Sequence, residues 1–349
     1  MSYISQALVC APNIQDMLSA GFAANGQNVV QEQYPFLQFL ASEANNFGIR
    51  QKVHPSTNKV KTVELLYQQR ILETDVSSNL SNPTCTATNK RGNLKADYTI
   101  DSAVNVGITQ LIDSDDLTCT DLPFGEFLTG QILRMVDAVD RKLASQAATQ
   151  AVALAGVWSN DTESSYTVSS DRLQIDIEVN NQIAPFGYHD IQTAAQMTGY
   201  GNQKVIFGGA VLNNYLLRSQ FGCCTDQGID LKALWAKYGV ASAYDRFLTA
   251  ALGDKDYSLL TQPGALALLW YTKAGWSNGA SVNIGADYAM TGIVSPNTGV
   301  PMDLTIKDDC GNISVSVIAT TKVVGLPTDM FSTNDNLDAV TFVNKIEAV

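Results

Sequence analysis

Apolar residues recur at steps of three and four over residues 120–155, the longest helical pattern in the chain. This spacing places them along one stripe of a helix. The stripe consists of Phe124, Leu128, Ile132, Met135, Val136, Val139, Leu143, Ala147, Ala151 and Leu154. Pro123 is tolerated in a first turn, and Gly156 supplies a stop. At ~1.5 Å per residue the helix would span roughly 45–50 Å. We predict a long helix against which a sheet packs closely.

The segment before this helix has the pattern of a long hairpin. Polar and apolar residues alternate over residues 59–73, which predicts an amphipathic strand, and residues 94–112 predict a second one. Residues 77–93 between them are rich in Ser, Thr and Asn and predict a loop tip. A two-stranded ribbon is only marginally stable alone, so we expect it to lie against something else.

The rest of the chain predicts a mixed α/β stretch and a closing β segment. The expected helices are residues 173–183, 210–220 and 231–238, with short helical pieces near Phe36, Phe39 and Leu40 in an extended N-terminal arm. The expected strands are residues 204–207, 241–248, 257–260, 266–272, 302–306 and 313–324, the last two joined by a turn at 308–312. No internal repeat is visible.

Charge is distributed unevenly along the chain. Residues 1–49 contain no Lys or Arg, whereas residues 50–95 hold eight basic and three acidic residues, an excess of +5. Since the whole chain carries −12, the remainder carries −17. The basic residues are Arg50, Lys52, Lys59, Lys61, Arg70, Lys90, Arg91 and Lys95. We predict that they contact an acidic body in another copy of the chain. The alternative is a solvated hairpin whose lysines keep an edge from aggregating.

Catalytic and ligand-binding motifs are scarce. The chain has no phosphate loop, nucleophile elbow or H-E-x-x-H motif, and its six cysteines form no C-x-x-C pair. Gly208 and Gly209 lie between a predicted strand and helix, and His189 precedes Asp190, so an α/β enzyme with a site near these residues stays an alternative. We predict no catalytic residue, no cofactor and no metal site. No apolar stretch is long enough for a transmembrane helix.

The order of these parts resembles the major capsid protein of tailed phages, the Hong Kong 97 fold. The likeness rests on the ribbon at 59–112, the helix at 123–156 with Val139, Asp140, Arg141 and Leu143, the strand and helix at 205–217, and the turn Gln262, Pro263, Gly264 and Ala265. The resemblance implies an α+β fold with an N-terminal arm (1–49), an extended β-hairpin loop (50–112), a peripheral domain containing the long spine helix (113–169 and 291–349) and an axial domain (170–290).

The resemblance also implies a function. The chain would be a major capsid protein that assembles as hexamers and pentamers into an icosahedral shell enclosing double-stranded DNA, without sequence-specific DNA binding. Its partners would be itself, a separate scaffolding protein, a portal and, in some shells, decoration proteins, with no membrane. It would be located in the virion after assembly in the host cytoplasm. An encapsulin-like compartment shell is the alternative use of the same fold.

Overall fold

The computed structural model describes residues 33–43, 48–52, 61–67, 94–100, 105–112, 124–158, 167–169, 171–179, 182–183, 187–220, 230–272, 282–285, 288–309, 312–325 and 342–349. The helices are α3 (Pro35–Glu43), α5 (Phe124–Ala153), α6 (Gly187–Met197), α7 (Ala210–Gln220), α8 (Leu231–Lys237) and α9 (Arg246–Leu252). The strands are β1 (Gly48–Lys52), β2 (Lys61–Tyr67), β3 (Leu94–Ile100), β4 (Asn105–Ile112), β5 (Thr167–Ser169), β6 (Arg172–Ile175), β7 (Glu178–Val179), β8 (Gln182–Ile183), β9 (Lys204–Gly208), β10 (Val240–Ala243), β11 (Tyr257–Thr261), β12 (Leu266–Trp270), β13 (Val282–Gly285), β14 (Tyr288–Val294), β15 (Pro301–Asp309), β16 (Asn312–Gly325) and β17 (Val343–Ala348). The predicted α+β class is confirmed.

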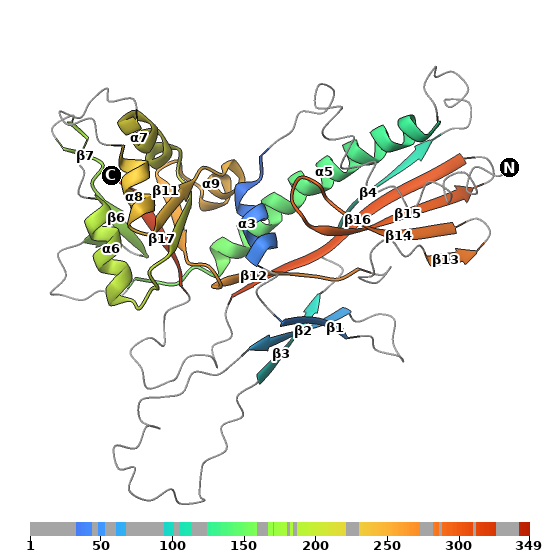
Figure 1. Cartoon of the computed structure of the whole chain (residues 1–349), viewed down its shortest axis with the longest axis horizontal. Helices are drawn as coiled ribbons and strands as arrows, with labels where there is room; N and C mark the ends of the chain where they lie inside the picture. Colours follow the sequence, from blue (N-terminus) through green and yellow to red (C-terminus); the bar gives the residue numbers. More distant parts are fainter. Residues whose placement is uncertain are drawn as a thin grey trace, which may run out of the picture.

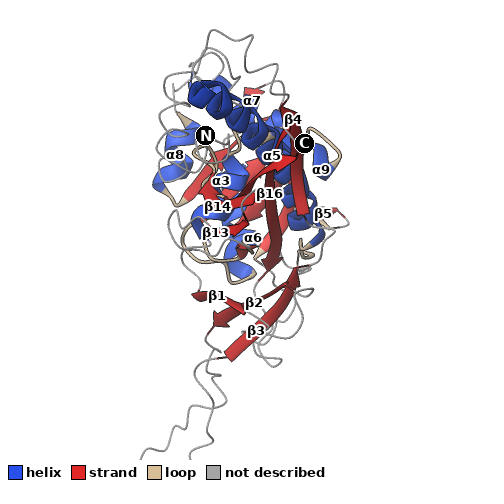
Figure 2. Ribbon diagram, turned by 90° about the vertical axis from the view of Figure 1, so that its right-hand side faces the viewer, coloured by secondary structure: helices blue, strands red, loops and turns tan. Residues whose placement is uncertain are grey.

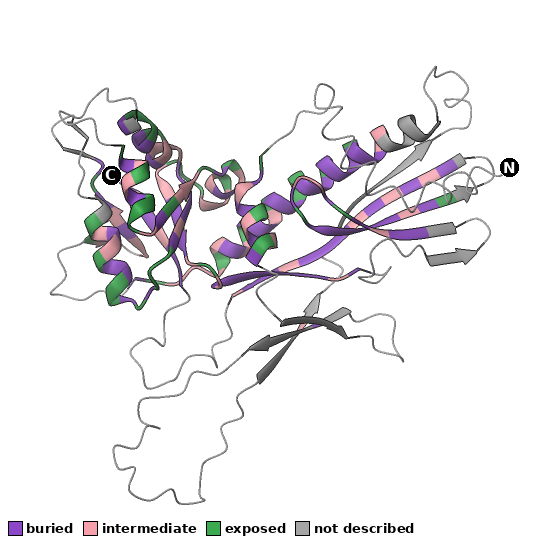
Figure 3. Cartoon of the chain, viewed as in Figure 1, coloured by how far each residue is buried: buried purple, intermediate pink, exposed green. Residues whose placement is uncertain are grey.

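The predicted long helix is confirmed as α5, which has 30 residues. It lies along a six-stranded sheet of order β12-β16-β15-β14-β13, in which β4 pairs with β16 (Figure 1). We call this the spine sheet. From Ile132 to Ala151 the stripe predicted from the sequence is buried in α5, and burial alternates along β16 from Ile313 to Ala319 (Figure 3). The small side chains of Ala144, Ala147, Ala148 and Ala151 are all buried and allow a close approach of the helix to its neighbours.

A second six-stranded sheet, the distal sheet, has the order β10-β9-β11-β17-β6-β5. Figure 1 shows it near the C-terminal end of α5, together with α6, α7 and α8. The helix α9 packs against α5 and also against β9 and β11, so it joins the two parts of the molecule. Viewed from the side, the helices and both sheets form one elongated body (Figure 2).

The predicted hairpin is confirmed in part. β2 and β3 pair antiparallel with Val63 opposite Tyr98, and β1 adds a third strand. The prediction that residues 94–112 form one strand of this ribbon is wrong, because β4 leaves it and pairs with β16, with Ile108 opposite Val317. β16 is 14 residues long, and eight of its residues pair with β4. The ribbon therefore emerges from the spine sheet itself.

Two other secondary-structure predictions are wrong. Residues 173–183 form β6, β7 and β8, not a helix, because Leu173 and Ile175 alternate with polar neighbours and are buried at a period of two. Residues 241–248 are the strand β10 followed by α9. Asp245 ends the strand as the N-cap of α9, since its carboxylate accepts hydrogen bonds from the amides of Phe247 and Leu248.

Two strands bear on the domain boundaries expected from the sequence. β12, expected in the axial domain, pairs with β16 of the spine sheet. β17, expected in the peripheral domain, lies between β11 and β6 of the distal sheet. The chain thus returns to the distal sheet at its C-terminal strand. The division into arm, loop, peripheral and axial domains stays a prediction.

Candidate functional site

The basic segment predicted to contact other copies lies partly within the described residues. Arg50 and Lys52 are on β1, Lys61 is on β2 and Lys95 is on β3. The other four candidates, Lys59, Arg70, Lys90 and Arg91, lie outside the described residues. The structure therefore brings half of the predicted residues together on one small sheet.

The strand register sorts the charged residues of this sheet by face. Residues directly opposite each other in neighbouring strands share a face, and the face alternates along each strand. Arg50 lies opposite Glu64, and Glu64 lies opposite Asp97. Lys52 is two residues from Arg50 and Lys95 is two residues from Asp97, so both lie on the same face as these residues. Three basic and two acidic positions therefore share one face, with Arg50 and Lys52 on one edge strand and Lys95 on the other.

The opposite face of the ribbon is anchored to the molecule. Val63 is completely buried and clusters with Ala267 and Leu269 of β12 and Val324 of β16, and Tyr98 packs against the same cluster. Burying such aliphatic side chains contributes about 1.5–3 kcal/mol each. The position of this cluster fixes which face of the ribbon is turned away from the body. It is the face of Arg50, Lys52 and Lys95, whereas the position of Lys61 belongs to the anchored face.

The N-terminal arm is braced against four elements through polar contacts. The Tyr34 hydroxyl donates to Asp137 Oδ1 of α5 (3.1 Å), and the Phe36 amide donates to Asp245 Oδ2 before α9 (3.1 Å). Gln38 Nε2 donates to the Asn297 carbonyl between β14 and β15 (2.7 Å). The Gly264 amide donates to Glu43 Oε2 (2.6 Å). The side chains of Phe36, Leu37 and Leu40 are also buried. This part of the arm therefore lies on protein.

One buried carboxylate fastens a turn to the spine helix. Asp140 of α5 is fully buried, and it accepts hydrogen bonds from Ser295 Oγ (2.6 Å) and Thr298 Oγ1 (2.8 Å). Burial raises the pKa of Asp140 to about 7, although the two hydroxyl donors act in the opposite direction and the nearby charge of Asp137 adds to the rise. We did not predict this site from the sequence. The sequence does contain an indication of it, because an acidic residue lies within the apolar stripe of the helix, between Val139 and Leu143.

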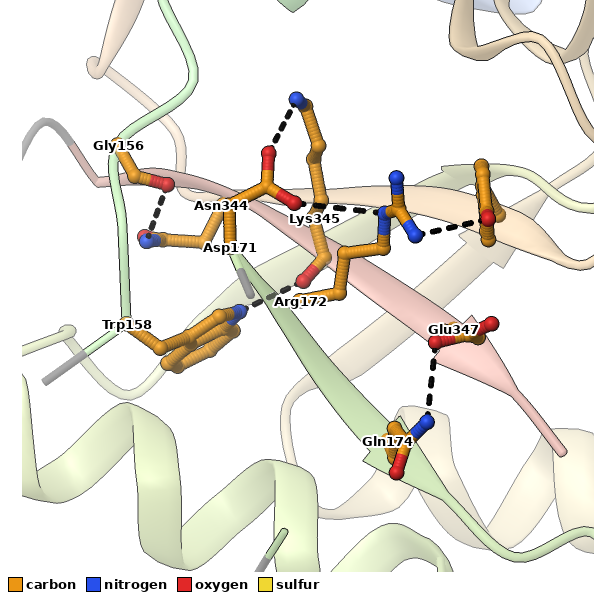
Figure 4. A network of polar contacts seen from close by, with 9 residues as sticks. Gly156, Trp158, Asp171, Arg172, Gln174, Asn344, Lys345 and Glu347 are labelled. Atoms are coloured by element: carbon orange, nitrogen blue, oxygen red, sulfur yellow. Dashed lines mark hydrogen bonds and ion pairs between the residues drawn. The ribbon is translucent and has the colours of Figure 1, made fainter. Parts of the chain in front are cut away.

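A polar network joins the end of the spine to the distal sheet (Figure 4). Trp158 Nε1 donates to the Lys345 carbonyl (2.6 Å), and Asn344 Nδ2 donates to the Gly156 carbonyl (3.2 Å). Lys345 Nζ is paired with Asp171 at 2.6 Å, which lowers the pKa of that carboxyl group. These contacts link the segment that leaves α5 to β17. We interpret them as structural contacts, since each of these groups binds another group of the same chain.

The glycine pair considered as a phosphate site is in close contact with the rest of the protein. Gly208 and Gly209 both have positive φ, +96° and +54°. A Cβ atom at Gly209 would collide with Ser258 Oγ, and the Val211 amide already donates to the Lys255 carbonyl (3.2 Å). Gly209 therefore allows a close approach to Ser258 of β11, and the Val211 amide at the start of α7 is not free to bind a phosphate.

The other candidate for catalysis, His189 with Asp190, lies in the first turn of α6, and His189 is exposed. Burial is the main cause that raises the pKa of Asp190, and the negative charge of Asp176 raises it further. His189 has the opposite effect and lowers this pKa. Among the described residues, no group of three or more His, Cys, Asp or Glu side chains could hold a metal ion. Within the same residues, no helix is both long and apolar enough to cross a membrane.

No family model matches the chain, and no curated protein sequence matches it. Several solved structures from bacteriophages are similar to it. A structure from Mycobacterium phage Che8 has 11% identity and a TM-score of 0.38, over 83% of this chain and 85% of that one. The capsid of Cyanophage P-SCSP1u has 11% identity and a TM-score of 0.39, over 84% of each chain. The mature capsid of bacteriophage PhiM1 has 10% identity and a TM-score of 0.39, over 85% of this chain and 84% of that one.

Proposed function

We propose that the protein is the major capsid protein of a tailed bacteriophage, and that its copies assemble as hexamers and pentamers into an icosahedral shell around double-stranded DNA. The observation that carries the proposal is the ribbon β1-β2-β3. It emerges from the spine sheet through β4, and its apolar side is anchored by Val63. Five of its six described charged positions share the other side, namely Arg50, Lys52, Glu64, Lys95 and Asp97. We infer that the side of the ribbon opposite its anchor contacts a neighbouring copy, as a shell subunit requires.

The charge distribution supports contact between copies of the chain. Residues 50–95 carry an excess of +5 on a chain whose remainder carries −17, so the ribbon of one copy is complementary to the body of another. The same acidic body disfavours tight binding of DNA, because phosphate contacts need a basic surface. A shell that encloses DNA without sequence-specific binding fits this balance.

The rigid core of the subunit supports the same proposal. The spine helix is held to the arm by Tyr34, to the β14–β15 turn by Asp140 and to the distal sheet through α9. A subunit that must fit many identical neighbours needs a fixed relation between its parts. We further propose a separate scaffolding protein and a portal as partners, and the virion as the location.

The proposal is tested by reversing charge on the ribbon. Lys52→Glu with Lys95→Glu converts two basic positions of the charged face into acidic ones on opposite edge strands. We expect the variant to fold, with unchanged circular dichroism, but to remain as unassembled subunits in a sedimentation assay. The matched control, Lys52→Arg with Lys95→Arg, keeps the charge and should assemble like the wild type.

Wild-type assembly should also weaken as ionic strength rises, because exposed charges are screened. A charge-reversed variant that assembles like the wild type would refute the role of this face. The encapsulin-like alternative predicts closed shells from this chain alone, loaded with a cargo enzyme, whereas the phage proposal predicts that a scaffolding protein from a neighbouring gene is needed.

A further inference from the structure

The side of α5 that the rest of the chain leaves uncovered carries positive charge. Exposed residues recur along this side at steps of three and four, so they share one face of the helix. Three of them are basic, Arg134, Arg141 and Lys142, and the hydroxyl residue Ser145 lies one turn further along. At ~1.5 Å per residue, the basic positions extend over roughly 12 Å of the helix axis. We call these four residues the basic stripe.

The acidic residues of the same part of the helix are turned inward. Within residues 131–153 the acids are Asp137 and Asp140, and both are buried. Asp137 accepts hydrogen bonds from Tyr34 and Arg141, and Asp140 is bonded to the turn between β14 and β15. The exposed face therefore carries basic residues and no acidic one, on a chain whose net charge is −12.

Two of the three basic side chains are uncommitted. Within the described part of the chain, neither Arg134 nor Lys142 forms an ion pair or a side-chain hydrogen bond. Arg141 is paired with Asp137 at 3.2 Å, but its side chain is 51% exposed, and a guanidinium group has five N–H donors. Arg134 and Lys142 can therefore bind an external anion without giving up a contact within the fold.

The ribbon and the basic stripe lie on opposite sides of the spine sheet (Figure 1). Along β12, Leu266 and Leu268 belong to the main core, which also contains the buried side of α5. The alternate residues Ala267 and Leu269 belong instead to the cluster that anchors Val63 of the ribbon. Since successive side chains of a strand point to opposite faces, the ribbon and α5 pack on different faces of the sheet. A neighbouring copy bound to the ribbon therefore leaves the basic stripe accessible to another partner.

The chemistry of this face selects the class of partner. Protein interfaces have an apolar core, but no large apolar side chain is exposed among the described residues of α5. Single-stranded nucleic acid is bound by aromatic stacking, and residues 130–153 contain no aromatic side chain. The phosphates of duplex DNA are contacted by Arg, Lys and Ser, which are the residue types of the stripe. Because a duplex carries one charge per ~1.7 Å of its axis, a stripe of this length faces several phosphates.

We propose that the basic stripe of α5 binds the phosphate backbone of double-stranded DNA without reading its sequence. Contacts to phosphate fix the position of a duplex but carry no sequence information. Three cations on an otherwise acidic chain make the contact weak and sensitive to salt. That this duplex is the DNA enclosed by the shell rests on the proposed function, and in such a shell the stripe lies on the inner wall.

DNA binding by unassembled, full-length subunits tests the stripe. The assay is the fluorescence anisotropy of a short labelled duplex at several low salt concentrations. Neutralising three phosphates gives a slope of about −2.7 for log affinity against log salt, so a fourfold rise in salt should weaken wild-type binding roughly fortyfold. In Arg134→Gln with Lys142→Gln, which keeps a good helix former at both positions, the slope should shrink to about −0.9. The same rise in salt should then weaken binding only about fourfold.

The matched control is Arg218→Gln with Lys237→Gln, which removes one arginine and one lysine from exposed positions in the last turns of α7 and α8. Its net charge equals that of the stripe variant, so it separates loss of the stripe from loss of charge. The control should keep the wild-type slope. Each single variant, Arg134→Gln or Lys142→Gln, should reduce the slope by about 0.9, which keeps the test decisive if the double variant does not fold.

Three results overturn the proposal: a wild type that binds no duplex, a double variant with the wild-type slope, and a control that loses as much as the double variant. Single-stranded DNA that binds as tightly as the duplex overturns it as well. If the double variant binds DNA normally but no longer assembles with its scaffolding protein, the stripe binds an acidic protein segment instead. Subunits that form icosahedral shells without binding DNA refute only the stripe, whereas subunits that bind DNA but never assemble refute only the capsid function.

Discussion

The brace between the arm and the spine helix gives a sharp quantitative prediction. Tyr34 is completely buried, and its hydroxyl donates a hydrogen bond to Asp137 Oδ1 at 3.1 Å. The centroids of its ring and of the Phe247 ring are 5.7 Å apart. Replacing Tyr34 with Phe removes only the hydrogen bond to a charged acceptor, which costs about 1.5–3 kcal/mol. Replacing it with Ala also empties the space of the ring and costs about 3–5 kcal/mol.

Hydrogen exchange of the α3 amides measures this brace. The Gln38 amide, bonded to the Tyr34 carbonyl at 2.9 Å, lies in the first turn and reports whether α3 is docked. The free energy of opening should fall in the order wild type, Tyr34→Phe, Tyr34→Ala. The control Tyr244→Phe removes a hydroxyl from an exposed tyrosine and should change it by less than about 0.5 kcal/mol. If Tyr34→Ala leaves the protection of α3 unchanged, the arm is not held by this contact.

Two further substitutions test local packing by thermal unfolding. Gly209→Ala should destabilise the protein strongly, because its Cβ would strike Ser258 Oγ, whereas Gly253→Ala, at a φ of +86° with open space around it, should cost only about 1 kcal/mol. Equal losses for the two would show that the contact with Ser258 is unimportant. Trp158→Phe removes the 2.6 Å hydrogen bond to the Lys345 carbonyl and should cost about 1–3 kcal/mol, and a neutral result would show that this bond does not fasten β17.

The elements with a strong period were predictable from the sequence. The spine helix follows from its apolar stripe, and β15 and β16 follow from alternation on either side of a turn. We predicted a helix at 173–183, but Leu173, Ile175 and Ile177 recur there at a period of two. This period is typical of a strand and not of a helix. The strand β4 could not be assigned, because alternation shows that a strand exists but not which strand pairs with it.

The candidate site was only partly predictable. Uneven charge pointed to the basic segment, but the separation of a charged face from an anchored face needed the register of β1, β2 and β3. The hydrogen bonds of Asp140 connect it to Ser295 and Thr298, which lie 155 and 158 positions later in the sequence. A buried acid in an apolar stripe signals that some partner exists, but the sequence does not say that Ser295 and Thr298 supply it.

Electron microscopy of the full-length protein, expressed with and without the proteins of its neighbouring genes, tests the central claim most directly. In the presence of the scaffolding protein, we predict closed shells of uniform size with icosahedral symmetry, built from hexamers and pentamers of this chain. Particles that stay monomeric under every condition, including coexpression with a scaffolding protein, would contradict the proposal that this protein forms a phage capsid.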